Sequence, residues 1–426
     1  MNPLKSINLQ FLKSKRLLLL PFISILLFLL NYKYLSRLIK SDLKLNITDY
    51  PVRRNCIKLQ KRIDDILLSE RKDWSVTVLD QKRNIISDIN STQLFIPASN
   101  QKLLSTAYAL DKLGTNFKLT TKLVKRTDGV LELWGQGDPD LNDLDIKNIS
   151  KAASEAFTFR ILNNKVPKII IYEEPSTNWW PDTWHTIDRL ESYGSPITRL
   201  AITSNSNDKS VQNPISRLNN SLTQEMSYYG FKPELITKDY NTQSSFFLGR
   251  RVIKKIESAP MISLLSLANS ESHNFTAEML IRHAADTWNS REAATRLKKW
   301  LHSKNIPVDQ FVLVDGSGLS RKNKVTTLGI ASLLWHMDTH QHSNFYKSSM
   351  AVAGIRGTMN DFNIDSALYG RFYGKTGTLT GVRAVSGILD TETNVRYVSI
   401  INNNGYQQDP KIRKILEVIY RFSQCD

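Results

Sequence analysis

The chain is poor in cysteine, with only Cys56 and Cys425 among its 426 residues. Two thiols allow at most one disulfide, so the fold must depend on a hydrophobic core. A chain of this length can form two domains and bury a substantial hydrophobic core. The two cysteines are either unrelated thiols or one disulfide that joins the first and last helices in an oxidising compartment.

The chain also lacks a long basic run beyond its N-terminal region, although its formal net charge is +17. Lysine and arginine are spread along the sequence, and no recognisable nucleic-acid-binding module is present. Only the positive net charge argues for a nucleic-acid partner, so we expect none. A basic surface that works near anionic lipid or an anionic polymer agrees better with this distribution.

A phosphate-binding loop is absent as well, because no Gly-x-x-x-x-Gly-Lys-Ser/Thr spacing occurs. No internal repeat is visible. We expect neither a cofactor nor a metal ion.

One long apolar run lies near the N-terminus. Residues 17–30 are apolar apart from Ser24, and Lys13, Lys15 and Arg16 precede them. A charged region followed by an apolar one is typical of targeting segments, and no small-x-small cleavage site follows. The run predicts a signal-anchor in the inner membrane; a cleaved signal peptide and a buried core helix are the alternatives.

The rest of the chain predicts a strand–helix body whose two halves are separated by a long insertion. Strand-like runs occur near both ends of this body, at 74–79 and 85–89 and again at 383–390 and 396–402. A final helix is expected at 410–422. Within the insertion we expect a hairpin at 118–124 and 130–134, a helix near 146–163, and strands at 168–172 and 244–248.

Ser99 and Lys102 form the most informative pair of side chains. They lie three residues apart at the start of an apolar helix pattern, so on a helix their side chains can touch. Pro97 precedes them and places Ser99 in the first turn, where backbone N–H groups are free and the helix dipole is positive. An oxyanion is stabilised there, and a desolvated Lys102 can act as a general base. An ordinary N-cap serine is the simpler alternative.

The Ser-x-x-Lys spacing occurs twice more, at Ser69/Lys72 and Ser206/Lys209. The first copy closes a polar helix end, and the second lies in a polar run that predicts a loop. Only the Ser99 copy follows two predicted strands and opens an apolar helix. Its context therefore distinguishes Ser99 from the other two serines.

A second cluster is Lys375-Thr376-Gly377-Thr378, before the C-terminal strands. The lysine can bind a carboxylate and shift neighbouring pKa values, the Thr376 hydroxyl can orient that carboxylate, and the glycine lets a ligand's backbone approach closely. A Gly/Thr turn with a solvated lysine is the alternative.

A third cluster is Ser272-His273-Asn274, at a predicted helix–helix junction. A hydroxyl and an amide two residues apart can point into one cleft, where Ser272 would relay protons to Lys102 and Asn274 would bind a substrate amide. We expect the His273 side chain to point away, and no acid at a recognisable spacing supports a Ser–His pair. A helix N-cap is the alternative.

Together the three clusters match the ordered set Ser-x-x-Lys, Ser-x-Asn and Lys-Thr-Gly of penicillin-binding proteins and β-lactamases. Further segments narrow the match: Gly-x-Gly-Asp-Pro at 135–139, Asp-Gly-Ser-Gly-Leu-Ser-Arg at 315–321 and Ala-Gly-x-x-Gly-Thr at 353–358. Over residues 70–405 or so, the sequence resembles the D-alanyl-D-alanine carboxypeptidases of the class C low-molecular-mass penicillin-binding proteins, peptidase family S13.

The resemblance implies serine acyl transfer on peptidoglycan stem peptides. Ser99 would attack the penultimate D-Ala carbonyl with Lys102 as its base, water would hydrolyse the acyl-enzyme, and β-lactams would be covalent inhibitors. The backbone N–H groups of Ser99 and Thr378 would form the oxyanion hole. The other implied roles are proton relay for Ser272 and Lys375, substrate-amide binding for Asn274, and substrate binding for Thr376, Gly377, Thr378 and Arg321.

The same resemblance implies an α/β (α+β) fold of the β-lactamase/transpeptidase type, an antiparallel sheet with helices on both faces, plus an inserted accessory domain. We expect a signal-anchor and linker at residues 1–50, a catalytic domain at 51–117 plus 258–426, and the insertion at 118–257. The protein would work in the periplasm or cell envelope, anchored to the inner membrane.

A β-lactamase and a catalytically silent peptidoglycan-binding scaffold are the alternatives. The long insertion and the S13-like segments disfavour a β-lactamase. A silent scaffold has no need of the complete set Ser99, Lys102, Ser272, Asn274 and Lys375. Carboxypeptidase and endopeptidase activity would share one site, and the motifs do not separate them.

Overall fold

The computed structural model describes residues 51–53, 56–158, 166–242, 249–306, 308–362, 367–405 and 408–424. The predicted signal-anchor at 17–30, the predicted strand at 244–248 and Cys425 lie outside these residues, so the anchor and the disulfide stay predictions. Among the described residues, none of the helices has the length and apolar character needed to cross a bilayer. Residues 51–426 form one compact unit.

A six-stranded antiparallel sheet joins the two ends of this unit. Its strand order is β10-β11-β12-β13-β1-β2, so the first strand lies beside the last, with Trp74 opposite Asn402. The strands predicted at both ends of the body are therefore present, and the structure shows that they are neighbours. The bounds are β1 Trp74–Leu79, β2 Ile85–Ile89, β10 Ala351–Val352, β11 Phe372–Leu379, β12 Val382–Asp390 and β13 Val395–Asn403.

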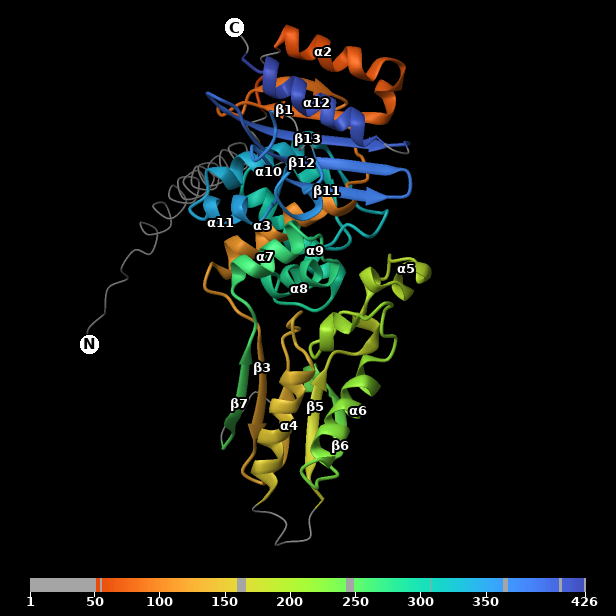
Figure 1. The fold of residues 1–426 in the computed structure, drawn as a ribbon, viewed down its shortest axis with the longest axis vertical. Helices are drawn as coiled ribbons and strands as arrows, with labels where there is room; N and C mark the ends of the chain where they lie inside the picture. The colour runs from red at the N-terminus through yellow and green to blue at the C-terminus, as the bar shows by residue number, and fades with distance from the viewer. Residues whose placement is uncertain are drawn as a thin grey trace, which may run out of the picture. The chain divides into compact units, whose positions relative to one another are not determined.

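One face of this sheet is covered by the first and last helices of the described chain, α2 (Ile57–Leu67) and α12 (Asp409–Phe422), which lie side by side (Figure 1). Leu59 and Ile63 of α2 share one apolar core with Ile412 and Ile415 of α12. The thiol of Cys56 donates a weak hydrogen bond to Phe422 O at 3.5 Å, which places it near the end of α12.

The opposite face packs against a group of helices centred on α3 (Gln101–Leu113). Every residue of α3 from Gln101 to Leu110 is buried. Gly114 caps the C-terminal end of the helix, with a φ of +75° that suits glycine. The other helices of this layer are α7 (Met261–Asn269), α8 (Asn274–Ala284), α9 (Ser290–Ser303), α10 (Thr327–Asp338) and α11 (Ser343–Ser348).

A second sheet is built entirely from residues between 120 and 257. Its order is β6-β5-β4-β3-β7; the predicted hairpin β3–β4 is antiparallel, whereas β4, β5 and β6 run parallel. Two helices, α4 and α6, share its apolar core. The bounds are β3 Thr120–Lys125, β4 Leu131–Trp134, α4 Asp143–Thr158, β5 Lys168–Glu173, α6 Pro214–Ser227, β6 Glu234–Asp239 and β7 Arg251–Glu257.

The segment between β5 and α6 connects this second sheet to the helices around α3. It contains the short helix α5 (Thr186–Leu190) and the buried Trp184, whose indole N–H donates to Asp315 Oδ2 at 2.9 Å. In return, the indole N–H of Trp288 donates to Ile197 O at 3.1 Å. Residues 179–199 thus pack on the helical layer that surrounds α3.

The pairing of α2 with α12 yields a stability prediction with an internal control. Ile63 is 0% exposed and Ile57, on the same helix, is 80% exposed. We expect Ile63→Ala to lower the free energy of unfolding by about 2–5 kcal/mol, because it leaves a cavity between the helices and the sheet. Ile57→Ala should change it by no more than about 0.5 kcal/mol. Urea unfolding measures both, and equal effects would contradict this packing.

Candidate active site

Ser99 lies in a 3₁₀ turn, Ala98–Asn100, that leads directly into α3. Ala98 has a φ of +47°, a left-handed conformation that is costly for a residue with a Cβ atom. The neighbouring loop packs closely against this turn at Gly318, where a Cβ atom would lie 1.9 Å from Ala98 O. The turn is therefore held in a strained conformation by its surroundings, and it places Ser99 at the head of the buried helix as the sequence predicts.

Lys102 is the buried centre of the site, with 0% of its surface exposed. Its Nζ atom donates to Ser99 Oγ at 2.9 Å, Asn274 Oδ1 at 2.6 Å and Ser317 O at 2.8 Å. Burial lowers the pKa of Lys102 to about 7, and the negative charges of Asp315 and Glu278 oppose that decrease. A lysine with this pKa can exchange a proton with Ser99 near neutral pH.

Asn274 is the first residue of α8 and connects Lys102 to the segment between β5 and α6. While its Oδ1 atom accepts from Lys102, its Nδ2 atom donates to Tyr193 O at 2.9 Å. Ser272 lies at the α7–α8 junction with a φ of +65°, and among the described residues no hydrogen bond joins its hydroxyl to Lys102 or Lys375. Among the described residues, Lys102 thus forms a hydrogen bond with Asn274 and none with Ser272.

The imidazole of His273 bonds within its own helix. Its Nδ1 atom lies 2.8 Å from Thr276 Oγ1, and burial, followed by the charge of Lys102, lowers its pKa to about 4. The ring is therefore neutral at physiological pH.

Lys375 on β11 is also fully buried, and its Nζ atom donates to Thr376 O at 2.8 Å. Burial lowers the pKa of Lys375 well below its ordinary value, the positive charge of Lys102 lowers it further, and Glu271 opposes both. The charge of one buried lysine, Lys102, thus affects the protonation of the other, Lys375.

The strand β11 presents a free edge next to Ser99. Its partner β10 pairs only with Tyr373 and Gly374, so within the described chain no strand covers the outer edge from Lys375 onwards. A Cβ atom on Gly377 would lie 2.8 Å from Pro97 O and 3.1 Å from Ser99 N. Glycine therefore lets this edge approach the backbone of the Ser99 turn closely.

The predicted substrate-binding side chains lie along and beyond this edge. Thr376 Oγ1 donates to Thr358 Oγ1 at 2.7 Å, and Thr378 Oγ1 accepts from the guanidinium of Arg383. Arg321 donates to Thr380 O at 2.8 Å, which places it at the end of β11.

Two buried carboxylates hold the loop that accepts from Lys102: Glu278, which lies outside the motifs, and Asp315, which begins the 315–321 segment. Glu278 Oε1 accepts from the backbone N–H groups of Gly316 and Ser317, both at 2.8 Å. Asp315, 0% exposed, accepts from the N–H groups of Gly318 and Ser320 at 2.8 and 2.7 Å. Burial raises the pKa of both carboxyls. In the sequence, Glu278 could have been recognised from its position four residues after Asn274, which places both residues on the same face of a helix.

A resident metal ion has no evident ligands here. Among the described residues, no group of three or more His, Cys, Asp or Glu side chains is arranged to hold one.

The sequence matches the family model described as "D-Ala-D-Ala carboxypeptidase 3 (S13) family" over residues 58–214 and 201–422. A carboxypeptidase DacB from Mycolicibacterium smegmatis is 28% identical, and the match covers 72% of this chain and 71% of that protein. The penicillin-sensitive carboxypeptidase A of Dictyostelium discoideum is 23% identical, with 91% and 98% covered.

Solved structures share the fold. Penicillin-binding protein 4 (dacB) from Haemophilus influenzae superposes with a TM-score of 0.70 at 18% identity, covering 84% of this chain and 98% of that one. Bd3459, a predatory peptidoglycan endopeptidase from Bdellovibrio bacteriovorus, gives a TM-score of 0.52 at 18% identity, covering 79% and 87%. These matches confirm the family and the fold class predicted from the three motifs. The chain belongs to the D-Ala-D-Ala carboxypeptidase 3 (S13) family.

Proposed function

We propose that the protein is a serine-type D-Ala-D-Ala carboxypeptidase that acts on peptidoglycan stem peptides through an acyl-enzyme on Ser99. The observation that carries this proposal is the contact between Ser99 Oγ and a fully buried Lys102 whose pKa is lowered to about 7. The family and the names of the related carboxypeptidases support the choice of reaction.

In the proposed acylation, neutral Lys102 takes the proton of Ser99 as the serine oxygen attacks the penultimate D-Ala carbonyl carbon. The negative charge moves to the carbonyl oxygen, where the backbone N–H groups of Ser99 and Thr378 stabilise it. The C–N bond then breaks, and the departing D-Ala amine receives a proton from Lys102, either directly or through Ser272 and Lys375. Water hydrolyses the resulting ester and restores Ser99.

The free edge of β11 supports a mode of substrate binding. An extended peptide can add to this edge as another strand, so that its backbone pairs with β11 and its scissile carbonyl lies beside Ser99. Thr376 and Thr378, with Arg321 near the end of the strand, would bind the terminal carboxylate. Asn274 would bind a substrate amide with the group that now contacts Tyr193 O.

β-Lactams would acylate Ser99 as mimics of the D-Ala-D-Ala end; a structure of the H. influenzae penicillin-binding protein 4 contains such a compound. Endopeptidase activity at the same site is a second candidate, supported by the shared fold of Bd3459. A silent scaffold would not require the lowered pKa of Lys102.

The cellular setting and the domain division belong to the same proposal. The enzyme works in the cell envelope, and residues 17–30, which lie outside the described residues, anchor it to the inner membrane. Residues 118–257, which supply the whole second sheet, form an inserted accessory domain in a catalytic domain of residues 51–117 and 258–426.

The nucleophile can be tested by substitution in the full chain. Ser99→Ala should abolish labelling by a fluorescent penicillin and release of D-Ala from a pentapeptide that ends in D-Ala-D-Ala. Lys102→Met should slow acylation by about 10²- to 10⁴-fold, because it removes the general base. Ser69→Ala and Lys72→Met, in an exposed copy of the same spacing, serve as matched controls and should change neither readout. Failure of the folded wild type to react with penicillin would refute the proposal.

The pH profile tests the role of Lys102. The ordinary lysine pKa is 10.5 and burial lowers that of Lys102 to about 7; since only the neutral amine accepts a proton, kcat/KM should rise with pH and level off above about 7. Asn274→Asp replaces the amide oxygen beside Nζ with a carboxylate, which favours the charged lysine and should move the rising limb up by about 1–3 pH units.

Asn213→Asp, an exposed helix N-cap on α6, introduces the same charge away from Ser99 and should leave the limb in place. If the pH profile of Asn274→Asp keeps its midpoint near 7, the rising limb reports the titration of a group other than Lys102.

A further inference from the structure

The helix α8 carries a line of buried polar side chains that begins at the active site. Asn274, Glu278 and Arg282 are spaced four residues apart, so they lie on one face of the helix, and they are 9%, 0% and 1% exposed. Polar and charged groups are costly to bury unless they are bonded or paired. Since Asn274 binds Lys102, the next two residues of the line are candidates for a role in the same site.

Glu278 is one residue removed from Lys102. Its Oε1 atom accepts from the backbone N–H groups of Gly316 and Ser317, both at 2.8 Å. The carbonyl oxygen of the same Ser317 accepts from Lys102 Nζ, also at 2.8 Å. The carboxylate of Glu278 therefore fixes the position of a hydrogen-bond acceptor of Lys102.

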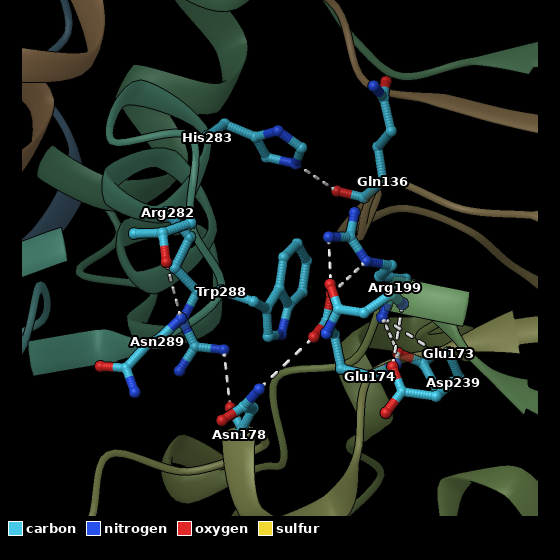
Figure 2. Close-up of polar contacts among 12 residues, drawn as sticks. Gln136, Glu173, Glu174, Asn178, Arg199, Asp239, Arg282, His283, Trp288 and Asn289 are labelled. Carbon is cyan, nitrogen blue, oxygen red and sulfur yellow. Dashed lines mark hydrogen bonds and ion pairs between the residues drawn. The ribbon is translucent and has the colours of Figure 1, made fainter. Parts of the chain in front are cut away.

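Glu278 and Arg282 each leave charged atoms unbonded. Among the described residues, Glu278 Oε2 has no hydrogen-bond donor, and Arg282 Nε and Nη2 have no acceptor. Arg282 Nη1 donates to Asn178 O at 3.1 Å, a bond drawn in Figure 2. Because the unbonded atoms are shielded from solvent, the opposite charge one helical turn away is what compensates each group.

The electrostatics agree with this pairing. Burial raises the pKa of Glu278 to about 7, the charge of Asp315 raises it further, and Arg282 opposes both. Burial lowers the pKa of Arg282 to about 10, and Glu278 is the first of the charges that oppose this decrease. The guanidinium is therefore charged at neutral pH, and it favours the ionised form of Glu278.

Two further charges act on Arg282 from the segment between β5 and α6. Glu174 raises its pKa and Arg199 lowers it. These two side chains are bound to each other, since Arg199 Nε donates to Glu174 Oε1 at 2.7 Å (Figure 2). The pair is neutral as a unit, so Glu278 is the main counter-charge of Arg282.

Other titratable groups also surround Lys102. Asp315 and then Glu278 favour its charged form. The charge of Lys102 in turn lowers the pKa values of Lys375 and His273. The two acids are therefore the groups that keep a proton on Lys102.

These two acids differ in what would be lost with their charge. Asp315 binds several N–H donors of its own loop and of the β5–α6 segment, so its replacement would disrupt the loop; the donors belong to Trp184, Gly318, Ser320 and Asn323. Glu278→Gln keeps a side-chain oxygen for the N–H groups of Gly316 and Ser317 and removes only the charge. The electrostatic effect of Glu278 can therefore be measured separately.

We propose that Glu278 is a positioning residue for Lys102 and that Arg282 acts through Glu278. The carboxylate of Glu278 holds the Ser317 carbonyl against the Lys102 amino group, and its negative charge stabilises the ammonium form of Lys102. Arg282, at the far end of the line, keeps Glu278 ionised. This inference rests on the acylation proposed at Ser99, in which the neutral amine is the base.

The test follows the rising limb of the pH profile for acylation by a fluorescent penicillin. Glu278→Gln should move the midpoint of this limb down by about 1 pH unit, because the ammonium form of Lys102 loses a neighbouring negative charge. A role in folding alone would change the amount of active protein or the plateau rate, and not the midpoint. The ¹³Cε resonance of Lys102 in lysine-labelled protein should show the same shift.

A double substitution tests whether Arg282 acts through Glu278. Arg282→Gln keeps an amide N–H for Asn178 O and removes the positive charge, so Glu278 takes up a proton at higher pH and the midpoint should move down by up to about 1 pH unit. In the Glu278→Gln background, Arg282→Gln should move it no further. The single Arg282→Gln variant also keeps the proposal testable should Glu278→Gln fail to fold.

Glu173→Gln is the matched control. Glu173 is 1% exposed and also accepts from backbone N–H groups, those of Glu174, Arg199 and Leu200, so this variant should leave the midpoint in place (Figure 2). A midpoint unchanged or raised in either single variant, an equal shift in Glu173→Gln, or a further downward shift in the double variant would overturn the proposal.

The proposed function and this inference fail in different ways. A folded wild type that does not react with penicillin would refute the function proposed for Ser99. The Lys102 resonance would then decide by itself whether Glu278 stabilises the ammonium form, because its titration requires no activity.

Discussion

The buried amino group of Lys102 is the constraint on which the rest of the site depends. A shift of its pKa from 10.5 to about 7 means that its surroundings disfavour the charged form by about 5 kcal/mol relative to water. Three oxygen acceptors hold the group in place but do not offset its removal from water. Because the protein destabilises the charged form of Lys102, this lysine can exchange protons at neutral pH.

Distant parts of the chain must meet to create these surroundings. The α3 helix supplies Ser99 and Lys102, the start of α8 supplies Asn274, and the loop after β8 (Phe311–Val312) supplies Ser317 O. Glu278 and Asp315 accept hydrogen bonds from the backbone of that loop, and Trp184, which lies between β5 and α6, donates to Asp315. Residues between β5 and α6 therefore help to shape the site although they contribute none of the three motifs.

Local patterns predicted much of this arrangement. The spacing of Ser99 and Lys102 predicted their contact, and the apolar runs predicted strands near both ends of the body, which the structure pairs in one sheet. The helix expected near 146–163 is α4, which begins at Asp143 and is described to Thr158. Patterns could not reveal the left-handed backbone at Ala98 and Ser272, because tertiary packing rather than residue type imposes it. For the same reason the hydrogen bond between Asn274 and Lys102 required the structure.

A direct titration of Lys102 tests whether this lysine can act as the base at neutral pH. In the protein with ¹³C-labelled lysine, the Cε resonance of Lys102, identified by its absence in Lys102→Arg, would be followed from pH 5 to pH 11. We expect a midpoint near 7, well below the ordinary lysine pKa of 10.5. A resonance that shows a protonated amino group up to about pH 10 would contradict the role of Lys102 as the base and the account built on it.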